Sequence, residues 1–137
     1  MIILRPAIET KFSGSAIEAD VGGRVFFNSA PDSEYPRVVF SRVSGVPDNV
    51  FAKTGESVLV QFDLFSMKSA GVAEIETMET DLKALFDDCT LTLTGKVLAK
   101  FARQNTVSME EEVPALPDGS TTVVHVAIEY EADYQAA

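Results

Sequence analysis

The stretch from Glu56 to Cys89 decides the fold, and its first part reads Ser57-Val58-Leu59-Val60-Gln61-Phe62-Asp63-Leu64-Phe65-Ser66. Successive side chains of an extended strand point to opposite faces, so every second residue shares a face. One face of this segment is apolar throughout and consists of Val58, Val60, Phe62 and Leu64. The alternation predicts a β-strand over residues 57–66 with one face in the core.

After Gly71 the apolar period changes from two to between three and four, which is typical of an α-helix. The residues that follow this period are Val72, Ile75, Met78, Leu82, Leu85, Phe86 and Cys89. They cover an arc of roughly 140° around the helix axis. Burying such a stripe contributes on the order of 10 kcal/mol before the entropy cost of ordering the chain. We therefore expect this helix to pack on the preceding strand and form the core.

The rest of the chain predicts an α+β fold in one domain spanning residues 1–137. A short helix is expected to end at Phe12, with Pro6 in its first turn. Further strands are expected over residues 24–27, 37–43, 97–109 and from 122 onward. The segment 109–120 predicts a projecting hairpin tip, and residues 135–137 are expected to fray. The predicted architecture is a single, mostly antiparallel sheet of about four to five strands with two helices on one face.

The composition and net charge exclude some classes of function. The net charge of −10 argues against a surface that binds nucleic acid through its phosphates, which would need clustered Lys and Arg. It suits either simple solubility or a surface past which DNA slides without binding. No apolar run is long enough for a membrane span and no secretory signal is present, so folding in a cytosol is expected.

Catalytic and metal-binding residues are not expected. Cys89 is predicted to be buried near a helix end and His125 to face solvent, so the two do not form a nucleophile–base pair. One Cys and one His are too few soft ligands for zinc. The many carboxylates follow no spacing typical of a calcium loop, and no glycine pattern forms a phosphate cradle, so no cofactor is expected.

The second face of the central strand also carries apolar groups, at Leu59, Phe65 and Met67. Two helices cannot readily cover both faces of one sheet. We therefore expect these three residues to meet another subunit or partner, and self-association to supply the cover.

Several short sequence segments resemble those of the tail completion proteins of long-tailed bacteriophages. More narrowly, they resemble the siphophage tail terminators, the group that includes the lambda terminator. These segments are Gly23-Arg24-Val25-Phe26, Ala30-Pro31, Tyr35-Pro36-Arg37-Val38-Val39-Phe40, Val60-Gln61-Phe62-Asp63-Leu64-Phe65-Ser66 and Thr92-Leu93-Thr94-Gly95. Together with the amphipathic helix they extend over residues 2–134.

The resemblance implies a non-enzymatic structural role. Terminators of this kind form a hexameric ring that caps the tail tube, ends its polymerisation and provides the surface that docks on the head. The implied partners are further copies of the chain, the major tail tube protein and the head–tail connector, with DNA passing through the lumen without specific binding. The implied location is the head-proximal end of the virion tail, after assembly in the host cytoplasm.

Within that interpretation, two groups of acids are candidates for the lumen or a projecting loop: Glu110, Glu111 and Glu112, and Glu129 and Glu131. Alternatives stay open. A head-completion or minor tail protein would have a similar size. A small carboxylate-dependent enzyme or ligand-binding domain would show a deep pocket with converging acids of shifted pKa. A host interaction domain would be a monomer with one apolar groove.

Overall fold

The computed structural model describes residues 3–30, 34–47, 55–114, 119 and 121–136. The elements are, in chain order, α1 (Leu4–Phe12), α2 (Ala16–Asp20), β1 (Val25–Phe27), β2 (Arg37–Pro47), β3 (Gly55–Met67), the 3-10 turn η1 (Lys68–Ala70), α3 (Val72–Phe86), β4 (Lys96–Glu112) and β5 (Thr122–Ala136). No helix among these residues has the length and apolar character needed to cross a membrane.

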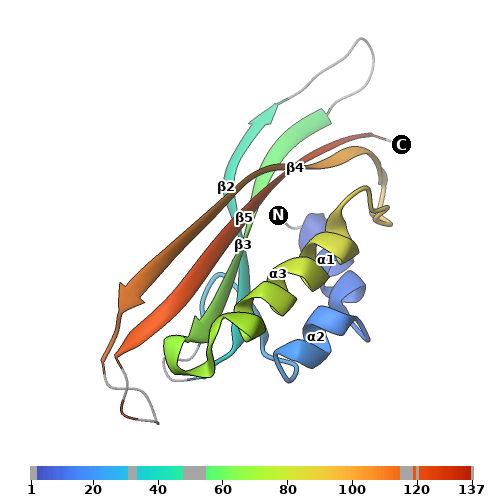
Figure 1. The fold of residues 1–137 in the computed structure, drawn as a ribbon. Coiled ribbons are helices and arrows are strands. Elements are labelled where there is room, and N and C mark those ends of the chain that lie inside the picture. The colour runs from blue at the N-terminus through green and yellow to red at the C-terminus, as the bar shows by residue number, and fades with distance from the viewer. Residues whose placement is uncertain (1–2, 31–33, 48–54, 115–118, 120, 137) are drawn as a thin grey trace.

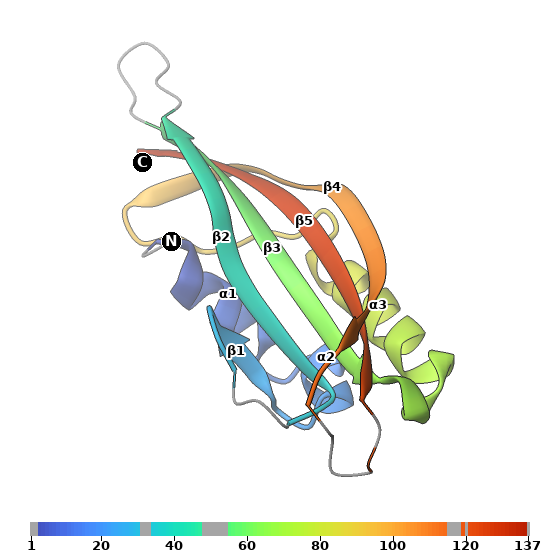
Figure 2. The ribbon, with the colours of Figure 1, turned by 90° about the vertical axis from the view of Figure 1, so that its left-hand side faces the viewer.

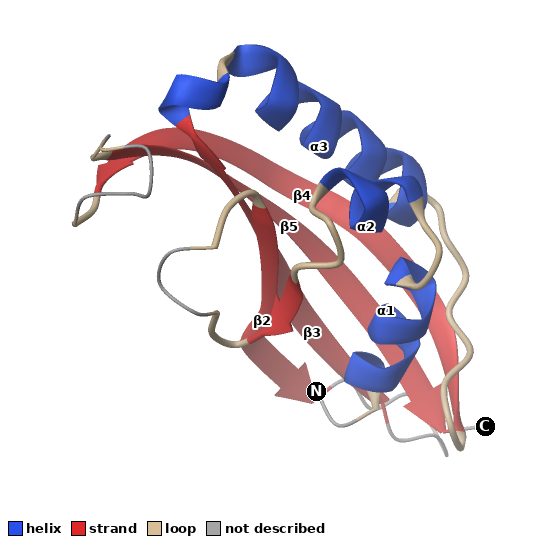
Figure 3. Cartoon of the chain, turned by 90° about the horizontal axis from the view of Figure 1, so that it is seen from below, coloured by secondary structure: helices blue, strands red, loops and turns tan. Residues whose placement is uncertain are grey.

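The five strands form one sheet in the order β1-β2-β3-β5-β4, with β3 at its centre. Only the short β1 runs parallel to its neighbour, and the three other pairings are antiparallel. All helices lie on the same face of this sheet (Figures 1 and 3). The predicted fold class is confirmed, although one short helix, α2, was not predicted.

The core lies between the sheet and α3, as the two periodic segments predicted. Val58, Val60, Phe62 and Leu64 have no exposed surface. Phe62 stacks on Phe86 of α3 with ring centroids 4.6 Å apart. Aromatic pairs of this kind add to the free energy gained by burying apolar area.

Three residues of the apolar stripe predicted for α3 are less buried than expected. Val72 is 70% exposed at the first position of α3. Leu85 is only partly buried. Cys89 lies beyond the end of α3 at Phe86, and it is also partly rather than fully buried.

The first helix, α1, ends at Phe12, directly before Ser13 and Gly14, as the sequence predicted. Pro6 occupies the first turn of α1, and Gly14 follows the helix with a φ of 75°, a conformation that suits glycine. The Ser15 hydroxyl then accepts a hydrogen bond from the Glu18 amide and caps α2. A five-residue helix is too short to show a period, so only this cap could have signalled it.

The last hairpin is more regular than predicted. β4 continues to Glu112, and the backbone amide of Val113 donates to the carbonyl of Thr121 at 2.8 Å. The hairpin tip therefore begins after the three glutamates, and residues 115–118 and 120 lie outside the described residues. The fraying predicted for Gln135 and Ala136 was wrong, because both pair with β4. Ala137 lies outside the described residues.

Candidate functional site

One face of the sheet is covered by none of the described helices and is the candidate site (Figure 2). Residues opposite each other on paired strands point to the same side, so the register defines this surface. We call it the helix-free face, and its members are Arg37, Val39, Ser41, Ser44 and Val46 of β2, Ser57, Leu59, Gln61, Asp63, Phe65 and Met67 of β3, Val123, His125, Ala127, Glu129, Glu131 and Asp133 of β5, and Lys100, Ala102, Asn105, Val107, Met109 and Glu111 of β4.

Stacked side chains cover one end of this face. The His125 ring stacks on Phe65, with centroids 4.3 Å apart and planes 20° apart. The Arg37 guanidinium lies 4.9 Å from the centroid of the same Phe65 ring and 4.5 Å from that of Tyr35. A cation over an aromatic face is electrostatically favourable. Phe65 is consequently half-buried within one chain.

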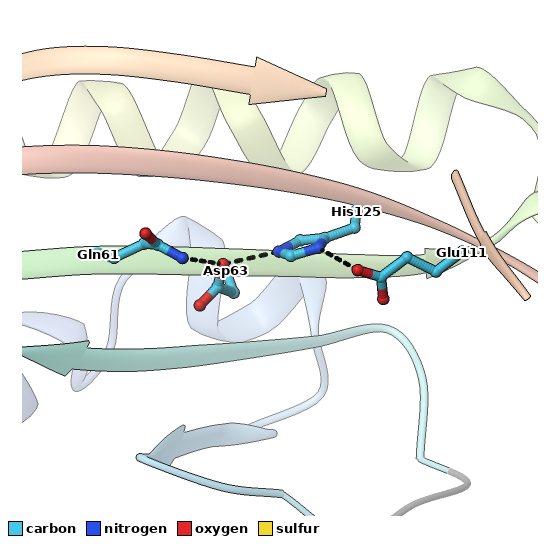
Figure 4. Close-up of polar contacts among 4 residues, drawn as sticks. All are labelled: Gln61, Asp63, Glu111 and His125. Atoms are coloured by element: carbon cyan, nitrogen blue, oxygen red, sulfur yellow. Dashed lines mark hydrogen bonds and ion pairs between the residues drawn. The ribbon is translucent and has the colours of Figure 1, made fainter. Parts of the chain in front are cut away.

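His125 is held by two carboxylates from different strands (Figure 4). Its Nε2 lies 2.6 Å from Oδ1 of Asp63, and its Nδ1 lies 3.0 Å from Oε1 of Glu111. Gln61 donates a second hydrogen bond, 2.7 Å long, to the same Asp63 oxygen. The side chain was expected to face solvent, and this was wrong: His125 is only 9% exposed.

These contacts set the protonation of the ring. Burial disfavours the charged form of His125, but the hydrogen bonds and charges of Asp63 and Glu111 outweigh it and raise the pKa. The protonated ring donates to both carboxylates at once. His125 therefore ties the central strand β3 to the edge strand β4.

The contacts of His125 differ from those of a nucleophile–base pair. Both ring nitrogens are engaged, so neither is left to take a proton from a substrate. Cys89 packs against the core on the opposite side of the sheet, and burial raises the pKa of its thiol. A Cys89–His125 pair does not form.

The predicted acidic residues separate into two groups. Glu111, Glu129 and Glu131 share the helix-free face, whereas Glu110 and Glu112 point to the other side of β4. Glu110 forms an ion pair with Lys68 of η1 at 3.1 Å. Glu112 accepts a hydrogen bond of 3.1 Å from Thr122. The three consecutive glutamates therefore fasten β4 to three different side chains.

The helix-free face has an excess of negative charge. Its five carboxylates are Asp63, Glu111, Glu129, Glu131 and Asp133, and its permanently charged bases are Arg37 and Lys100. Glu131 lies 3.4 Å from Lys100 and accepts a hydrogen bond of 3.3 Å from Ser57. Glu129 is partly exposed. The net charge of this surface therefore repels anions.

The three apolar interface candidates lie on this face. Leu59, Phe65 and Met67 are each half-buried, and they alternate with Gln61 and Asp63 along β3. The face is therefore mixed rather than a continuous apolar patch.

The sequence missed the residues that surround His125. An aspartate at position 63, between Phe62 and Leu64, was the available signal. Its partner could not be identified from the sequence, because 62 residues separate Asp63 from His125.

The larger cavities do not hold a pair of acids with shifted pKa. One, of about 690 Å³, lies between α1 and residues 85–94, and another, of about 590 Å³, is lined by residues 88–102. Desolvation, followed by a hydrogen bond with Asp81, raises the pKa of Asp20 to about 6, but this residue lies outside both cavities. Within the described ranges, no group of three His, Cys, Asp or Glu side chains could hold a metal ion.

Comparison with known proteins identifies a shared fold. No protein-family model and no curated protein matches the chain. A solved structure described as the virion of a native gene transfer agent particle contains a chain with a TM-score of 0.72 and 13% sequence identity. The match covers 98% of this chain and 96% of that chain. The two chains therefore have the same fold over almost their whole lengths.

Proposed function

We propose that this chain is a structural protein of a phage-like virion and acts as a tail terminator. Copies form a hexameric ring that caps the tail tube, ends its polymerisation and offers a surface to the head. The observation that carries the proposal is the fold shared with a gene transfer agent virion chain over 98% of this chain and 96% of the other.

The charge distribution supports a role in contact with passing DNA. The whole chain has a net charge of −10, and the helix-free face has more carboxylates than bases. A ring with this face inward presents negative charge to the phosphates of DNA, so the DNA passes without adhering. Glu129 and Glu131 are the proposed lumen residues, together with Glu111.

The side-chain contacts favour a structural role over a catalytic one. His125 has both ring nitrogens engaged by Asp63 and Glu111, and the raised pKa of Asp20 belongs to a carboxyl pair outside the two larger cavities. A head-completion or minor tail protein is the alternative within the virion. It would bind the head connector or another tail protein without limiting tube growth.

The experiment combines the purified chain with a candidate major tail tube protein, sought among the products of the genes beside its own. We expect electron micrographs to show rings at one tube end, and tubes to become shorter as the ratio of this chain to tube protein rises. A chain that stays monomeric with tube protein present and leaves tube length unchanged would refute the proposal. Binding to the connector alone would instead support the head-completion alternative.

A further inference from the structure

The sheet has two open edges. Among the residues that the structure describes, β4 pairs only with β5, and its other edge has no strand beside it. β1 covers β2 only from Val38 to Phe40, so among the described residues the outer edge of β2 is open over residues 41–47. Unpaired backbone groups on a strand edge are a template for another strand.

The exposed hydrophobic side chains are concentrated on these edges. Among the described residues, Val43 and Val46 of β2 and Val97, Val107 and Met109 of β4 are exposed, and the one further large exposed hydrophobic is Val72 of α3. Strand edges are usually protected by charge, proline or bulges. β4 has its two bulges and its three bases before residue 106, so the charge on residues 106–112 comes only from Glu110, Glu111 and Glu112. Segment 41–47 of β2 has Arg42, a bulge at Val43 and Pro47 at its end.

The two open segments have complementary charge. The one charged residue of segment 41–47 is Arg42. The charged residues of segment 106–112 are Glu110, Glu111 and Glu112. Opposite charges on two self-associating edges favour a head-to-tail contact and disfavour pairing of either edge with itself.

We propose that residues 41–47 of β2 in one copy pair with residues 106–112 of β4 in the next copy, which makes the sheet continuous between subunits. This inference rests on the proposed ring and identifies its contact surfaces. β2 and β4 run in opposite directions within the chain, since β2, β3, β5 and β4 are successively antiparallel. Copies related by rotation about an axis to which the strands are inclined at less than a right angle keep their strand directions, so β2 and β4 meet as antiparallel neighbours.

One register satisfies the side-chain faces. Setting Ser44 opposite Met109 of the next copy places Val46 opposite Val107, and all four belong to strand positions on the helix-free side. Val43 sits in the β2 bulge, so Arg42 then lies opposite Glu110, both on the helix side. A slip of one residue would put apolar and charged residues on the wrong faces.

This register also has a geometry that can close. Ser44 is level with Glu131 of β5 and Met109 with His125, six residues apart. At ~3.3 Å per residue the stagger between copies is about 20 Å, while four strands at ~4.8 Å make each copy about 19 Å wide. The strands then tilt by about 45°, at the upper end of the roughly 35–45° range of closed sheets. The helices lie on the other face and leave the helix-free face for the lumen (Figure 3).

Disulfide cross-linking tests the contact. In a Cys89→Ser background, the variant Val46→Cys/Val107→Cys is expected to give a ladder of covalent oligomers on oxidation, because each copy offers one thiol to each neighbour. Each single variant is expected to stay monomeric. The matched control Val72→Cys/Val107→Cys places one thiol on an exposed residue away from the edges.

A ladder of equal strength from the control, or dimers from a single variant, would overturn the inference. Charge exchange is the second measurement: Arg42→Glu or Glu110→Arg alone should weaken association by about tenfold or more, and the two together should restore it. Rings in micrographs without a cross-linked ladder would overturn the edge pairing and leave the terminator proposal standing. A cross-linked ladder without capped tubes would support the edge pairing and overturn the terminator proposal.

Discussion

The imidazole of His125 lies flat on the ring of Phe65, with centroids 4.3 Å apart and planes 20° apart. The same imidazole binds Asp63 of β3 and Glu111 of β4 through its two nitrogens. One side chain of β5 therefore connects three neighbouring strands on the helix-free face. This connection stabilises the end of the edge strand that we propose to meet the next copy.

His125 makes stability depend on pH. Its pKa is raised in the folded chain, so its contribution to the free energy of unfolding is fully present below the unfolded value near 6.5 and is lost as pH rises through the folded value. We expect His125→Gln to lose more stability relative to wild type at pH 6 than at pH 9, measured by urea unfolding. An NMR titration that places the pKa of His125 below 6.5 would contradict this explanation.

Asp20 also makes the stability of the fold depend on pH, at lower pH than His125 does. Desolvation and the hydrogen bond with Asp81 raise its pKa to about 6, so the stability linked to its protonation is present below about pH 4 and is lost as pH rises through 6. Asp20→Asn mimics the protonated carboxyl and is expected to raise the melting temperature at pH 8 but not at pH 4. Asp88→Asn removes one negative charge at an exposed position and is the control. An equal gain from both variants would point to net charge instead.

Tyr130 connects β5 to the end of α3. Its hydroxyl donates a 2.6 Å hydrogen bond to Asp87, which also lies 3.3 Å from Arg103 of β4. Burial, with Asp87 next, raises the pKa of Tyr130, so the hydroxyl stays a donor at all ordinary pH values. Tyr130→Phe should cost about 1.5–3 kcal/mol in unfolding free energy, because the acceptor is a carboxylate, the bond is short and Tyr130 is fully buried.

Tyr134 provides the comparison for that substitution. Its hydroxyl donates a longer hydrogen bond, 3.0 Å, to Glu56 at the start of β3. Tyr134→Phe is expected to cost about 0.5–1 kcal/mol. If Tyr130→Phe were as mild as Tyr134→Phe, or if the double variant Tyr130→Phe/Asp87→Asn lost as much as the two single variants added together, the Tyr130–Asp87 bond would not be the cause.

The negative charge of the helix-free face can be reversed. The variant Glu129→Lys/Glu131→Lys is expected to retain duplex DNA in a gel-shift assay at low salt, and the retention should weaken steeply as salt is raised. Wild type should not retain DNA. Glu9→Lys/Glu76→Lys makes the same change in net charge on helices α1 and α3. Equal retention by this control would show that net charge, and not the helix-free face, governs the effect.

The alternation in β3 and the period in α3 were sufficient to predict the core. Each pattern is local, and the apolar residues involved, such as Phe62 and Phe86, have enough area to bury each other in almost any arrangement of one strand and one helix. The chain ends were harder. Gln135 was expected to fray, but it pairs with Val97 because β4 begins early enough to reach it.

The sequence by itself determined the strand-and-helix core and the negative charge, since both depend on residue types and their spacing along the chain. Tertiary structure alone decided that His125 is enclosed by Asp63 and Glu111, and that the open segments of β2 and β4 lie on opposite edges of one sheet. The physical reason is the register and order of the strands. Both follow from pairings between residues far apart in sequence, and a shift of one position exchanges every side chain between the faces.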